Sequence, residues 1–328
     1  MHVGRFYTVK EVFFWTLRET TVFVVAAAIP TLAWAFFGHK WLALPWQPVA
    51  LVGTAVAFVT GFKNNAAYGR LWEARQIYGS IVNLSRTWAV QVLDLVTSPP
   101  EVKRALVYRH LAWLTAMRFQ LRESRNWERV RVNPADANYT TFYDVAEWKT
   151  ELPAELKGLI DEGELQKLLT TKNRATHLLA AQSRALQELS ARGETTELRF
   201  VELQKSIAGL YDAQGRAERI KNFPYPRQFS TLNTYFIWLL SVSLPFALLP
   251  ELEKMGSAYA WLCIPLAATV SWIFFMIDKI GEASENPFCG GPNDIPITAL
   301  SRTIEIDLRE LLGETPPPPI QPRNLILM

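Results

Sequence analysis

The sequence predicts an all-α membrane protein with four transmembrane helices and a helical cytoplasmic domain. Four stretches without a charged side chain predict the helices that cross the membrane: residues 20–38, 41–62, 228–250 and 255–277. A helix needs about 20 mostly apolar residues to cross roughly 30 Å of hydrocarbon, and each stretch meets that length. Charged residues, which make up 20% of the chain, are concentrated in residues 63–227. This separation of apolar and charged sequence is the main evidence for the fold class.

The average composition conceals the separation. The chain is 49% hydrophobic, has a net charge of +3 and has a mean hydropathy of +0.05, values that a soluble protein can also have. A soluble protein of this length would spread its apolar residues over periodic, half-polar elements. Uncharged runs of this length therefore disfavour a soluble core.

The distribution of Lys and Arg predicts the orientation in the membrane. Basic residues precede the first span, follow the second and precede the third, whereas the two short outer loops contain only Lys40 and Lys254. Loops rich in Lys and Arg stay on the cytoplasmic side. We therefore expect a multi-pass protein of the cell (inner) membrane. Residues 1–19, 63–227 and 278–328, the last with a Pro-rich tail, are expected to be cytoplasmic.

A cleaved signal peptide is the alternative explanation of the first span. Ala33-Trp34-Ala35 has the small residues of a cleavage site. However, the preceding segment contains Glu11 and Glu19 and is long for the charged start of a signal peptide. We therefore interpret residues 20–38 as a retained span.

The helical pattern of the second span continues beyond the membrane, because apolar residues recur three or four apart up to Leu95. Ser98-x-x-Glu101, with Pro99 at the first helical position, predicts a capping box that opens a helix ending near Glu123. Residues 126–145 are rich in Asn, Asp, Pro and Tyr and predict a loop.

Two further helical stretches are predicted at 154–191 and 194–216, the first with a break near Gly163. The tail at Pro316–Pro319 cannot be helical and is expected to be extended. No segment shows a convincing β alternation, so the expected fold contains helices alone.

Enzyme and metal motifs are not found. The four His residues have no metal-ligand spacing, and the common phosphate-binding, nucleophile-elbow and zinc-protease motifs do not occur. Cys263 lies in a span and Cys289 in a cytoplasmic loop, so a disulfide is not expected. The spans also lack the ionisable residues of a proton-coupled carrier. We expect no enzymatic activity, no cofactor, no metal and no nucleic-acid partner.

Within the second span, Thr54, Phe58 and Phe62 fall at i, i+4 and i+8 and share one helix face. Polar residues follow directly, beginning with Lys63-Asn64-Asn65. A helix that becomes polar while staying helical suits a pore that opens into an aqueous vestibule. Ordinary packing or lipid contact explains the same spacing, so the residues alone leave both interpretations open.

Longer motifs resemble those of one family. The end of the second span contains Gly61-Phe62-x-Asn64-x5-Arg70-x-Trp72-Glu73-Ala74-Arg75. Glu218-Arg219-Ile220-x3-Pro224-x-Pro226 precedes the third span. After the fourth span come Ile280-Gly281-Glu282-x2-Glu285-Asn286-Pro287-Phe288-x4-Asn293-Asp294-Ile295-Pro296 and Arg302-Thr303-Ile304-Glu305-Ile306. In this order they resemble the bestrophin family over nearly the whole chain.

The resemblance implies a homopentameric ion channel with one central pore and a helical cytoplasmic vestibule. The family's neck positions correspond to Thr54, Phe58 and Phe62. The cytoplasmic aperture corresponds to Leu198, although a one-turn shift in the alignment gives Val201 or Glu194. A leucine that packs between helices is the other interpretation of Leu198.

The sequence departs from the family pattern in two places. Thr54 stands where a bulky aliphatic residue is usual, and its hydroxyl can hydrogen-bond an ion or water. Cys289-Gly290-Gly291-Pro292 stands where animal members have the acidic run of a calcium clasp, which leaves only Asp294 nearby. Calcium takes six to eight oxygen ligands. The resemblance therefore implies a calcium-independent, prokaryotic member.

We thus expect a channel through which small ions pass passively, with anion or monovalent-cation selectivity left open. The alternative from another class is a membrane-anchored assembly or regulatory protein that acts through residues 63–227. A membrane-embedded enzyme is a third and weaker interpretation. Ion flux through reconstituted liposomes separates the first two.

Overall fold

The computed structural model describes residues 1–38, 40–128 and 142–328. It divides into two compact units. The apolar unit comprises residues 4–69 and 224–285, and the polar unit comprises residues 1–3, 70–223 and 286–328. All named elements of the described residues are helices, which confirms the predicted all-α class.

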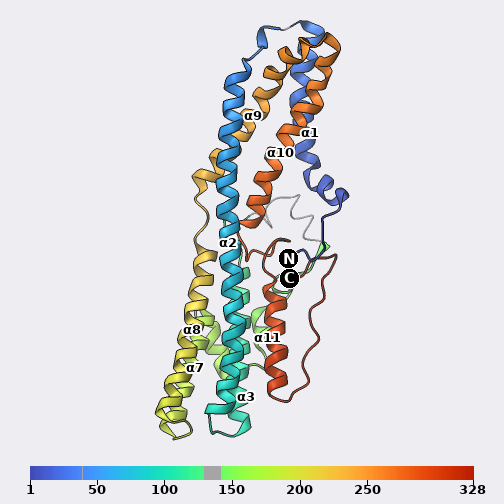
Figure 1. The fold of residues 1–328 in the computed structure, drawn as a ribbon. Coiled ribbons are helices and arrows are strands. Elements are labelled where there is room, and N and C mark those ends of the chain that lie inside the picture. Colours follow the sequence, from blue (N-terminus) through green and yellow to red (C-terminus); the bar gives the residue numbers. More distant parts are fainter. Residues whose placement is uncertain (39, 129–141) are drawn as a thin grey trace. The chain divides into compact units, whose positions relative to one another are not determined.

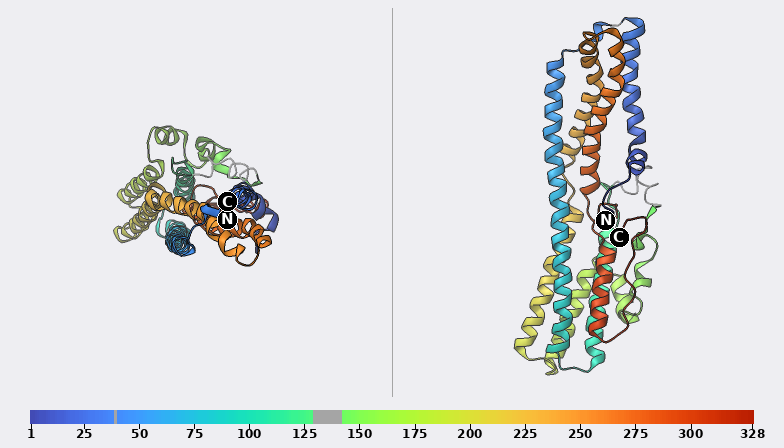
Figure 2. Two further views of the ribbon diagram at one scale, coloured as in Figure 1. Left: turned by 90° about the horizontal axis from the view of Figure 1, so that it is seen from above. Right: turned by 45° about the vertical axis from the view of Figure 1, so that its right-hand side comes forward.

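The apolar unit is built from long helices. They are α1 (Val9–Phe37), the first part of α2 (Trp46–Leu95), α9 (Arg227–Glu253) and α10 (Cys263–Ser284). Short 3₁₀ turns, η1 (Lys40–Leu42) and η4 (Ser257–Leu262), precede α2 and α10. Helices α1, α9 and α10 pack side by side in both views of Figure 2.

Three helical segments are long and apolar enough to cross a membrane: Trp15–Phe37, Arg227–Glu253 and Ser257–Ser284. They coincide with the first, third and fourth predicted spans. The second predicted span, 41–62, falls in the first part of α2, whose remainder is polar, and α2 begins only at Trp46. The number of four spans therefore remains a prediction.

Helix α1 begins and ends at sequence signals. The Thr8 hydroxyl accepts a hydrogen bond from the Glu11 amide at 3.2 Å, and the Glu11 carboxylate accepts one from the Thr8 amide at 2.7 Å. Together these bonds form a capping box. The helix stops at Gly38, whose φ of +65° is the left-handed conformation of a C-terminal cap.

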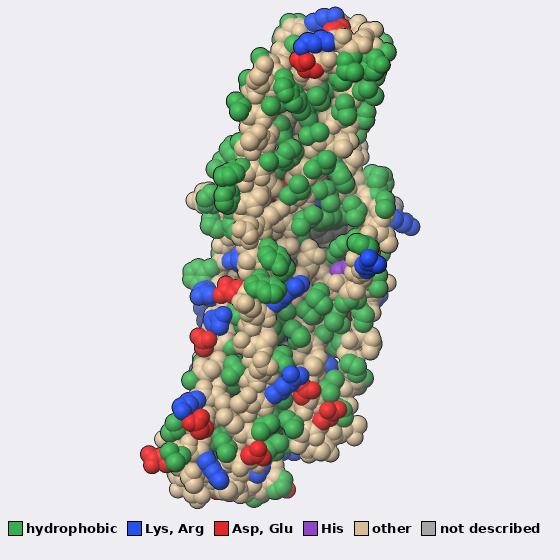
Figure 3. All heavy atoms as spheres, viewed as in Figure 1, with side chains coloured by type: hydrophobic (Ala, Val, Ile, Leu, Met, Phe, Trp, Pro, Cys, Tyr) green, Lys and Arg blue, Asp and Glu red, His purple; other side chains and the backbone are tan. Residues whose placement is uncertain are grey.

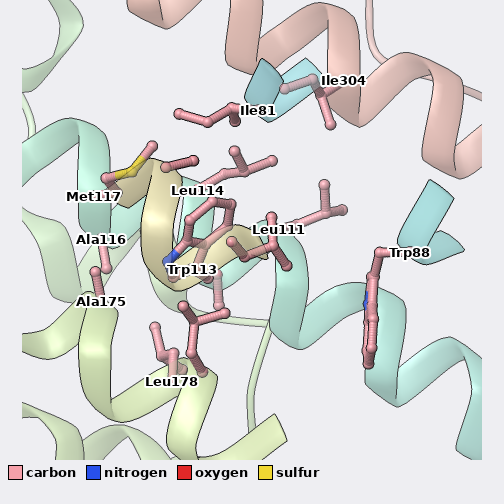
Figure 4. Close-up of a cluster of buried hydrophobic side chains, with 14 of the residues drawn as sticks. Ile81, Trp88, Leu111, Trp113, Leu114, Ala116, Met117, Ala175, Leu178 and Ile304 are labelled. Carbon is pink, nitrogen blue, oxygen red and sulfur yellow. The ribbon is translucent and has the colours of Figure 1, made fainter. Parts of the chain in front are cut away.

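The polar unit contains the second part of α2 and six further helices. They are α3 (Pro100–Arg122), α5 (Leu152–Leu156), α6 (Glu162–Leu169), α7 (Arg174–Ala191), α8 (Glu197–Asn222) and α11 (Ile297–Leu311), with a 3₁₀ turn η3 at Ala146–Trp148. Figure 4 shows the core that they share, in which Trp88 of α2, Trp113 of α3 and Ile304 of α11 are buried.

The predicted capping box at Ser98 is wrong. The N-cap of α3 is Pro99, which has no side chain able to cap the helix, and Pro100 occupies the first turn. The Ser98 hydroxyl instead donates to the carboxylate of Glu194, in the loop before α8. A partner distant in the sequence has thus replaced the local one. The predicted end of this helix near Glu123 is confirmed.

The predicted helix at 154–191 is three helices rather than one. The chain breaks on both sides of α6, and Gly163, the expected break, lies inside it. Asp161 and Asn173 start new helices, because their side chains accept hydrogen bonds from the amides of Glu164 and Thr176. The predicted 194–216 helix is observed as α8, shifted toward the C-terminus. Most of the predicted loop at 126–145 lies outside the described residues.

The tail after α11 is not helical, as predicted, and it does not hang free. The last residues pair with the first ones: the Val3 amide donates to the Leu325 carbonyl at 2.8 Å, and the Leu327 amide donates to the Met1 carbonyl at 2.9 Å. Figure 1 shows the two termini side by side. Ile326 and Met328 are buried in a small cluster with Tyr143 and Val145.

Hydrophobic side chains are spread over the visible surface of the apolar unit, between the backbone and uncharged polar groups (Figure 3). Several are almost uncovered, including Leu51, Phe36 and Phe37, each at least 70% exposed. A water-soluble surface rarely carries so large an apolar patch, whereas a lipid-facing or subunit-facing surface does.

Candidate pore-lining site

The three predicted neck residues lie on one exposed face of α2 in the apolar unit. Thr54 is exposed, and Phe58 and Phe62 are 67% and 59% exposed. The two rings meet edge to face, with centroids 4.5 Å apart and planes at 81°. This arrangement is favourable for aromatic pairs. The pair forms an apolar surface about one helical turn long that the described chain leaves largely uncovered.

The Thr54 hydroxyl already has a partner inside the helix. Its oxygen lies 3.0 Å from the carbonyl oxygen of Ala50, to which it donates. The lone pairs of the hydroxyl oxygen are left for a group outside the helix. In this conformation Thr54 can accept a hydrogen bond from water or face a cation.

The opposite face of α2 packs against the rest of the apolar unit. The face that carries Phe58 and Phe62 therefore points away from the core of the unit. Val49 and Val56 are buried against Ile237 and Leu240 of α9. Gly53 faces the same helix, since a Cβ there would make an ordinary contact with the Leu240 side chain at 3.7 Å. Phe58 and Phe62 consequently do not serve as core packing within the described chain.

A buried polar cluster lies one residue beyond Phe62. Lys63 Nζ is 2.6 Å from Asp278 Oδ1 of α10, and the two side chains are 2% and 7% exposed. The Asn233 side-chain amide of α9 donates to the same carboxylate oxygen at 2.7 Å. The Thr60 hydroxyl in turn donates to Asn233 Oδ1 at 3.0 Å. An ion pair compensates for its desolvation only when further hydrogen bonds satisfy it, as they do here.

The next residue of the family motif makes a second contact between the same helices. The Asn64 side-chain amide donates to the Ile277 carbonyl of α10 at 2.8 Å. At Gly281, one turn further along α10, a Cβ would lie only 1.9 Å from Asn64 Oδ1. Only glycine fits there without displacing Asn64. Close packing of α2 against α10 therefore explains both Asn64 and Gly281 of the motif.

The same end of α10 also contacts α1 and the start of α9. Lys279 Nζ donates to the Trp15 carbonyl at 2.9 Å and lies 3.7 Å from Glu19. Glu285, directly after α10, pairs with Arg227 at 2.6 Å. Polar contacts of α10 therefore join all four long helices of the apolar unit at one level.

The remaining motif residues of α2 belong to the polar unit. Arg70 donates to the carbonyls of Ile220 and Phe223 at 2.9 Å each, and so caps the C-terminal end of α8. Glu73 pairs with Arg219 of α8. Trp72 and Arg75 are exposed. Arg70 and Glu73 thus have structural roles in holding α8 against α2.

The motif after α10 folds into a closed loop. Phe288 is buried against Tyr78, with ring centroids 5.8 Å apart. Asp294 is 1% exposed and accepts hydrogen bonds from the amides of Gly290 and Gly291 at 2.7 and 2.9 Å. Burial raises the pKa of Asp294, and the nearby Arg122 guanidinium opposes that rise. Oδ2 of the carboxylate therefore holds the turn of the loop together through both backbone amides.

Arg122 supplies the positive charge of this loop. Its guanidinium is buried, donates to the Phe288 carbonyl at 3.0 Å and lies 3.7 Å from Asp294. Asn286 accepts from the Cys289 amide through its carbonyl, and Asn293 is half-buried beside Asp294. Within the described ranges, no three His, Cys, Asp or Glu residues are grouped as a metal site would require.

The predicted aperture residue, Leu198, is the second residue of α8 and is 81% exposed. The chain therefore does not bury it as a packing leucine. Of the two shifted alternatives, Val201 is 44% exposed on the same helix. Glu194 precedes the helix and is bonded to Ser98 and Thr97, which leaves it less able to line an opening.

The polar cluster around Lys63 and Asp278 was not among the predicted site residues. A signal for it exists, because each is the first charged residue after an uncharged run. Such a residue is normally assigned to the aqueous side of a span. Sequence alone does not show that the two side chains are buried and meet.

A family model described as bacterial/fungal bestrophin protein matches residues 7–310. The chain belongs to the bestrophin family. A voltage-dependent anion channel-forming protein of Mesorhizobium japonicum is 27% identical to this bestrophin over 270 residues, 82% of this chain and 76% of the relative. The voltage-dependent anion channel-forming protein YneE of Escherichia coli K12 is 26% identical over 288 residues, 88% and 83% of the two chains.

Solved structures confirm the bestrophin fold. A bacterial bestrophin homolog from Klebsiella pneumoniae superposes with a TM-score of 0.78 at 22% sequence identity. The match covers 92% of this chain and 99% of the other. The family model thus confirms the family that the motifs indicated, and the superposition agrees with the all-α architecture predicted from the uncharged runs and helical patterns.

Proposed function

We propose that this bestrophin is a homopentameric ion channel that conducts passively and without calcium control. Five copies of α2 would surround one pore, with Thr54, Phe58 and Phe62 forming a neck and Leu198 a second restriction. The observation that carries the proposal is the exposed Phe58–Phe62 face, whose back is packed against α9. An apolar ring of this kind can gate by dewetting or pass weakly hydrated ions along ring edges.

The proposed topology has four spans, with both termini and residues 63–227 on the cytoplasmic side of a cell (inner) membrane. The three apolar helices and the excess of Lys and Arg outside the short outer loops support it. The fourth span would be the first part of α2, a helix whose exposed face lines a pore and need not be as apolar as a lipid-facing one.

Independence from calcium is supported by the loop after α10. The carboxylate of Asp294 is buried, its Oδ2 accepts hydrogen bonds from two backbone amides, and Arg122 is its counter-charge. An arginine cannot be released or replaced as a bound ion can. The loop therefore stays closed at any calcium concentration.

Flux through liposomes that contain the purified protein tests the proposal. We expect ion flux above that of empty liposomes, equal in chelator and in millimolar calcium. Replacing chloride by a large anion, and separately sodium by a large cation, then assigns selectivity from the reversal potential. The names of the relatives favour anions, whereas the outward lone pairs of Thr54 favour cations. Assembled protein that passes no ion would instead support the membrane-anchored regulatory role.

A further inference from the structure

The basic residues of the apolar unit fall into two groups. The unit contains eight Lys and Arg residues in the sequence, and five of them pair with a carboxylate of the same unit. The five pairs are Lys40–Glu253, Lys63–Asp278, Arg227–Glu285, Lys254–Glu251 and Lys279–Glu19. The other three, Arg5, Lys10 and Arg18, have no carboxylate partner among the described residues.

All three cations without a carboxylate partner lie in one short stretch, residues 5–18, where the Arg5 guanidinium lies 5.2 Å from the centroid of the Phe6 ring. The nearest acidic residues in the sequence are used elsewhere: Glu11 accepts hydrogen bonds from the Thr8 amide and hydroxyl at 2.7 and 2.8 Å, and Glu19 lies beside Lys279. The stretch of residues 5–18 therefore carries a net charge of +2, from three cations and the carboxylate of Glu11, and none of its three cations forms a salt bridge among the described residues.

The position of the stretch along α1 places it at the membrane surface. The apolar segment begins at Trp15. Lys10 precedes it by five residues, which is about 7.5 Å at 1.5 Å per residue. The headgroup layer on each side of the hydrocarbon is roughly 5–7 Å thick. Arg18 lies within the first turn of the segment, from which its long side chain can reach the same layer.

The stretch also carries apolar side chains that the described residues leave exposed. Phe6 is 75% exposed and Val9 is 87% exposed. Val9 and Leu17 lie two turns apart on one side of α1, with Lys10 next to Val9. Basic residues beside exposed apolar ones are typical of segments that lie in a membrane interface and attract anionic lipids.

We propose that this basic surface, formed by Arg5, Phe6, Val9, Lys10, Leu17 and Arg18, binds the phosphate headgroups of anionic phospholipids. The cations contact the phosphates, and the apolar side chains enter the boundary of the acyl chains. The inference does not depend on conduction, because it rests only on the charges and exposure of α1 and of the residues before it.

Native mass spectrometry of the assembled, detergent-purified protein tests this surface with two lipids, dioleoyl phosphatidylglycerol and dioleoyl phosphatidylcholine. We expect the parent to retain phosphatidylglycerol in preference to phosphatidylcholine. Changing Arg5→Gln, Lys10→Gln and Arg18→Gln together should lower that preference at least tenfold, since each basic residue at an anionic surface contributes roughly fivefold. Lys10→Gln alone should lower it about fivefold for the same reason, without any change in assembly.

The matched control is Lys40→Gln with Lys254→Gln, which removes two exposed cations that already have carboxylate partners. It should keep the parental preference within twofold. The proposal is overturned if the triple variant and Lys10→Gln both retain phosphatidylglycerol like the parent, or if the control loses as much. It is equally overturned if inorganic phosphate displaces the lipid, because the site would then bind free phosphate. Ion flux measured on the same samples reports on the channel proposal separately.

Discussion

Phe58 and Phe62 leave most of their rings uncovered by the chain that carries them, although Val49 and Val56 on the other side of α2 are buried. If the rings form the neck, Phe58→Ala or Phe62→Ala removes one ring per subunit from one level of the pore. Conductance should rise and discrimination between ions should change, because the wall widens and wets more easily. Liposome flux and reversal potentials, with the yield of assembled protein, measure both.

Trp46→Ala is the control for the neck, since Trp46 is the first residue of α2 and lies two turns from Thr54. It should leave permeation nearly unchanged. If Phe58→Ala assembles normally and conducts with parental ion preference, Phe58 does not line the pore.

The buried pair Lys63–Asp278 gives a second prediction at this scale. Asp278→Asn leaves a buried ammonium without its anion, which typically costs about 3–5 kcal/mol. Lys63→Met combined with Asp278→Asn removes both charges and should recover much of that loss. Thermal unfolding followed by size-exclusion fluorescence measures the difference.

Lys254→Gln provides the comparison, because Lys254 and Glu251 form an exposed pair with side chains 69% and 49% accessible. A pair of that kind contributes about 0–1 kcal/mol. If Asp278→Asn were as stable to heat as Lys254→Gln, the Lys63–Asp278 pair would not hold α2 and α10 together.

His110 supplies a pH-dependent prediction for the polar unit. It is buried between Trp88 and Trp113, and neither ring nitrogen has a hydrogen-bond partner among the described residues. Burial lowers the pKa of His110 to about 3. The unfolded chain takes up the proton near pH 6.5, well before the folded chain does. The free energy of unfolding should thus fall by about 3 kcal/mol between pH 7 and pH 4 because of this residue.

His110→Leu should lose that part of the pH dependence and should be no less stable than the parent at pH 7, because it removes two unsatisfied buried nitrogens. Denaturant unfolding of both proteins at a series of pH values measures the difference. Parallel curves for parent and variant from pH 7 to pH 4 would contradict the assignment of a buried neutral imidazole.

Helices of the apolar unit approach one another closely where glycine allows it, and α10 shows the clearest case. Gly281→Ala would place a Cβ 1.9 Å from Asn64 Oδ1, so Asn64 must give up its position against the Ile277 carbonyl. We expect a lower unfolding temperature for this variant. Adding Asn64→Ala should restore part of the loss, because it removes the obstructing oxygen.

Gly215→Ala is the matched control on a helix of the polar unit. A Cβ at Gly215 meets nothing within 4 Å in the described chain, and alanine favours a helix interior by about 1 kcal/mol. Gly215→Ala should therefore be neutral or stabilising. If both substitutions lowered the unfolding temperature equally, the effect of Gly281→Ala could not be assigned to its clash with Asn64.

Element boundaries illustrate what local sequence does and does not specify. The Gly38 stop and the end of α3 follow from residues at the helix ends. Ser98 fails as a cap because Glu194, 96 residues away, competes for its hydroxyl. The breaks around α6 depend on Asp161 and Asn173, whose capping strength outweighs the apolar periodicity that runs across them.

At the scale of the whole molecule, one chain exposes an apolar face on α2 that it does not cover. Such a face needs lipid or other subunits, and the bestrophin resemblance implies five subunits. Detergent-solubilised protein should show fivefold symmetry in particle averages, and mass photometry should give five times the 37.3 kDa of one chain. A stable monomer or dimer as the main species would exclude a pore lined by five copies of α2.

The sequence by itself determined the fold class, the first, third and fourth apolar segments, the family and the helix face that carries Thr54, Phe58 and Phe62. These features depend on composition, local periodicity and motif order, which are properties of neighbouring residues. Tertiary structure alone decided that Lys63 meets Asp278 in a buried cluster, that Arg122 lies beside Asp294, and that Arg5, Lys10 and Arg18 have no carboxylate partner among the described residues. Pairing of charges depends on which helices pack together, and no local pattern encodes a contact between residues as distant in the sequence as Lys63 and Asp278 or Arg122 and Asp294.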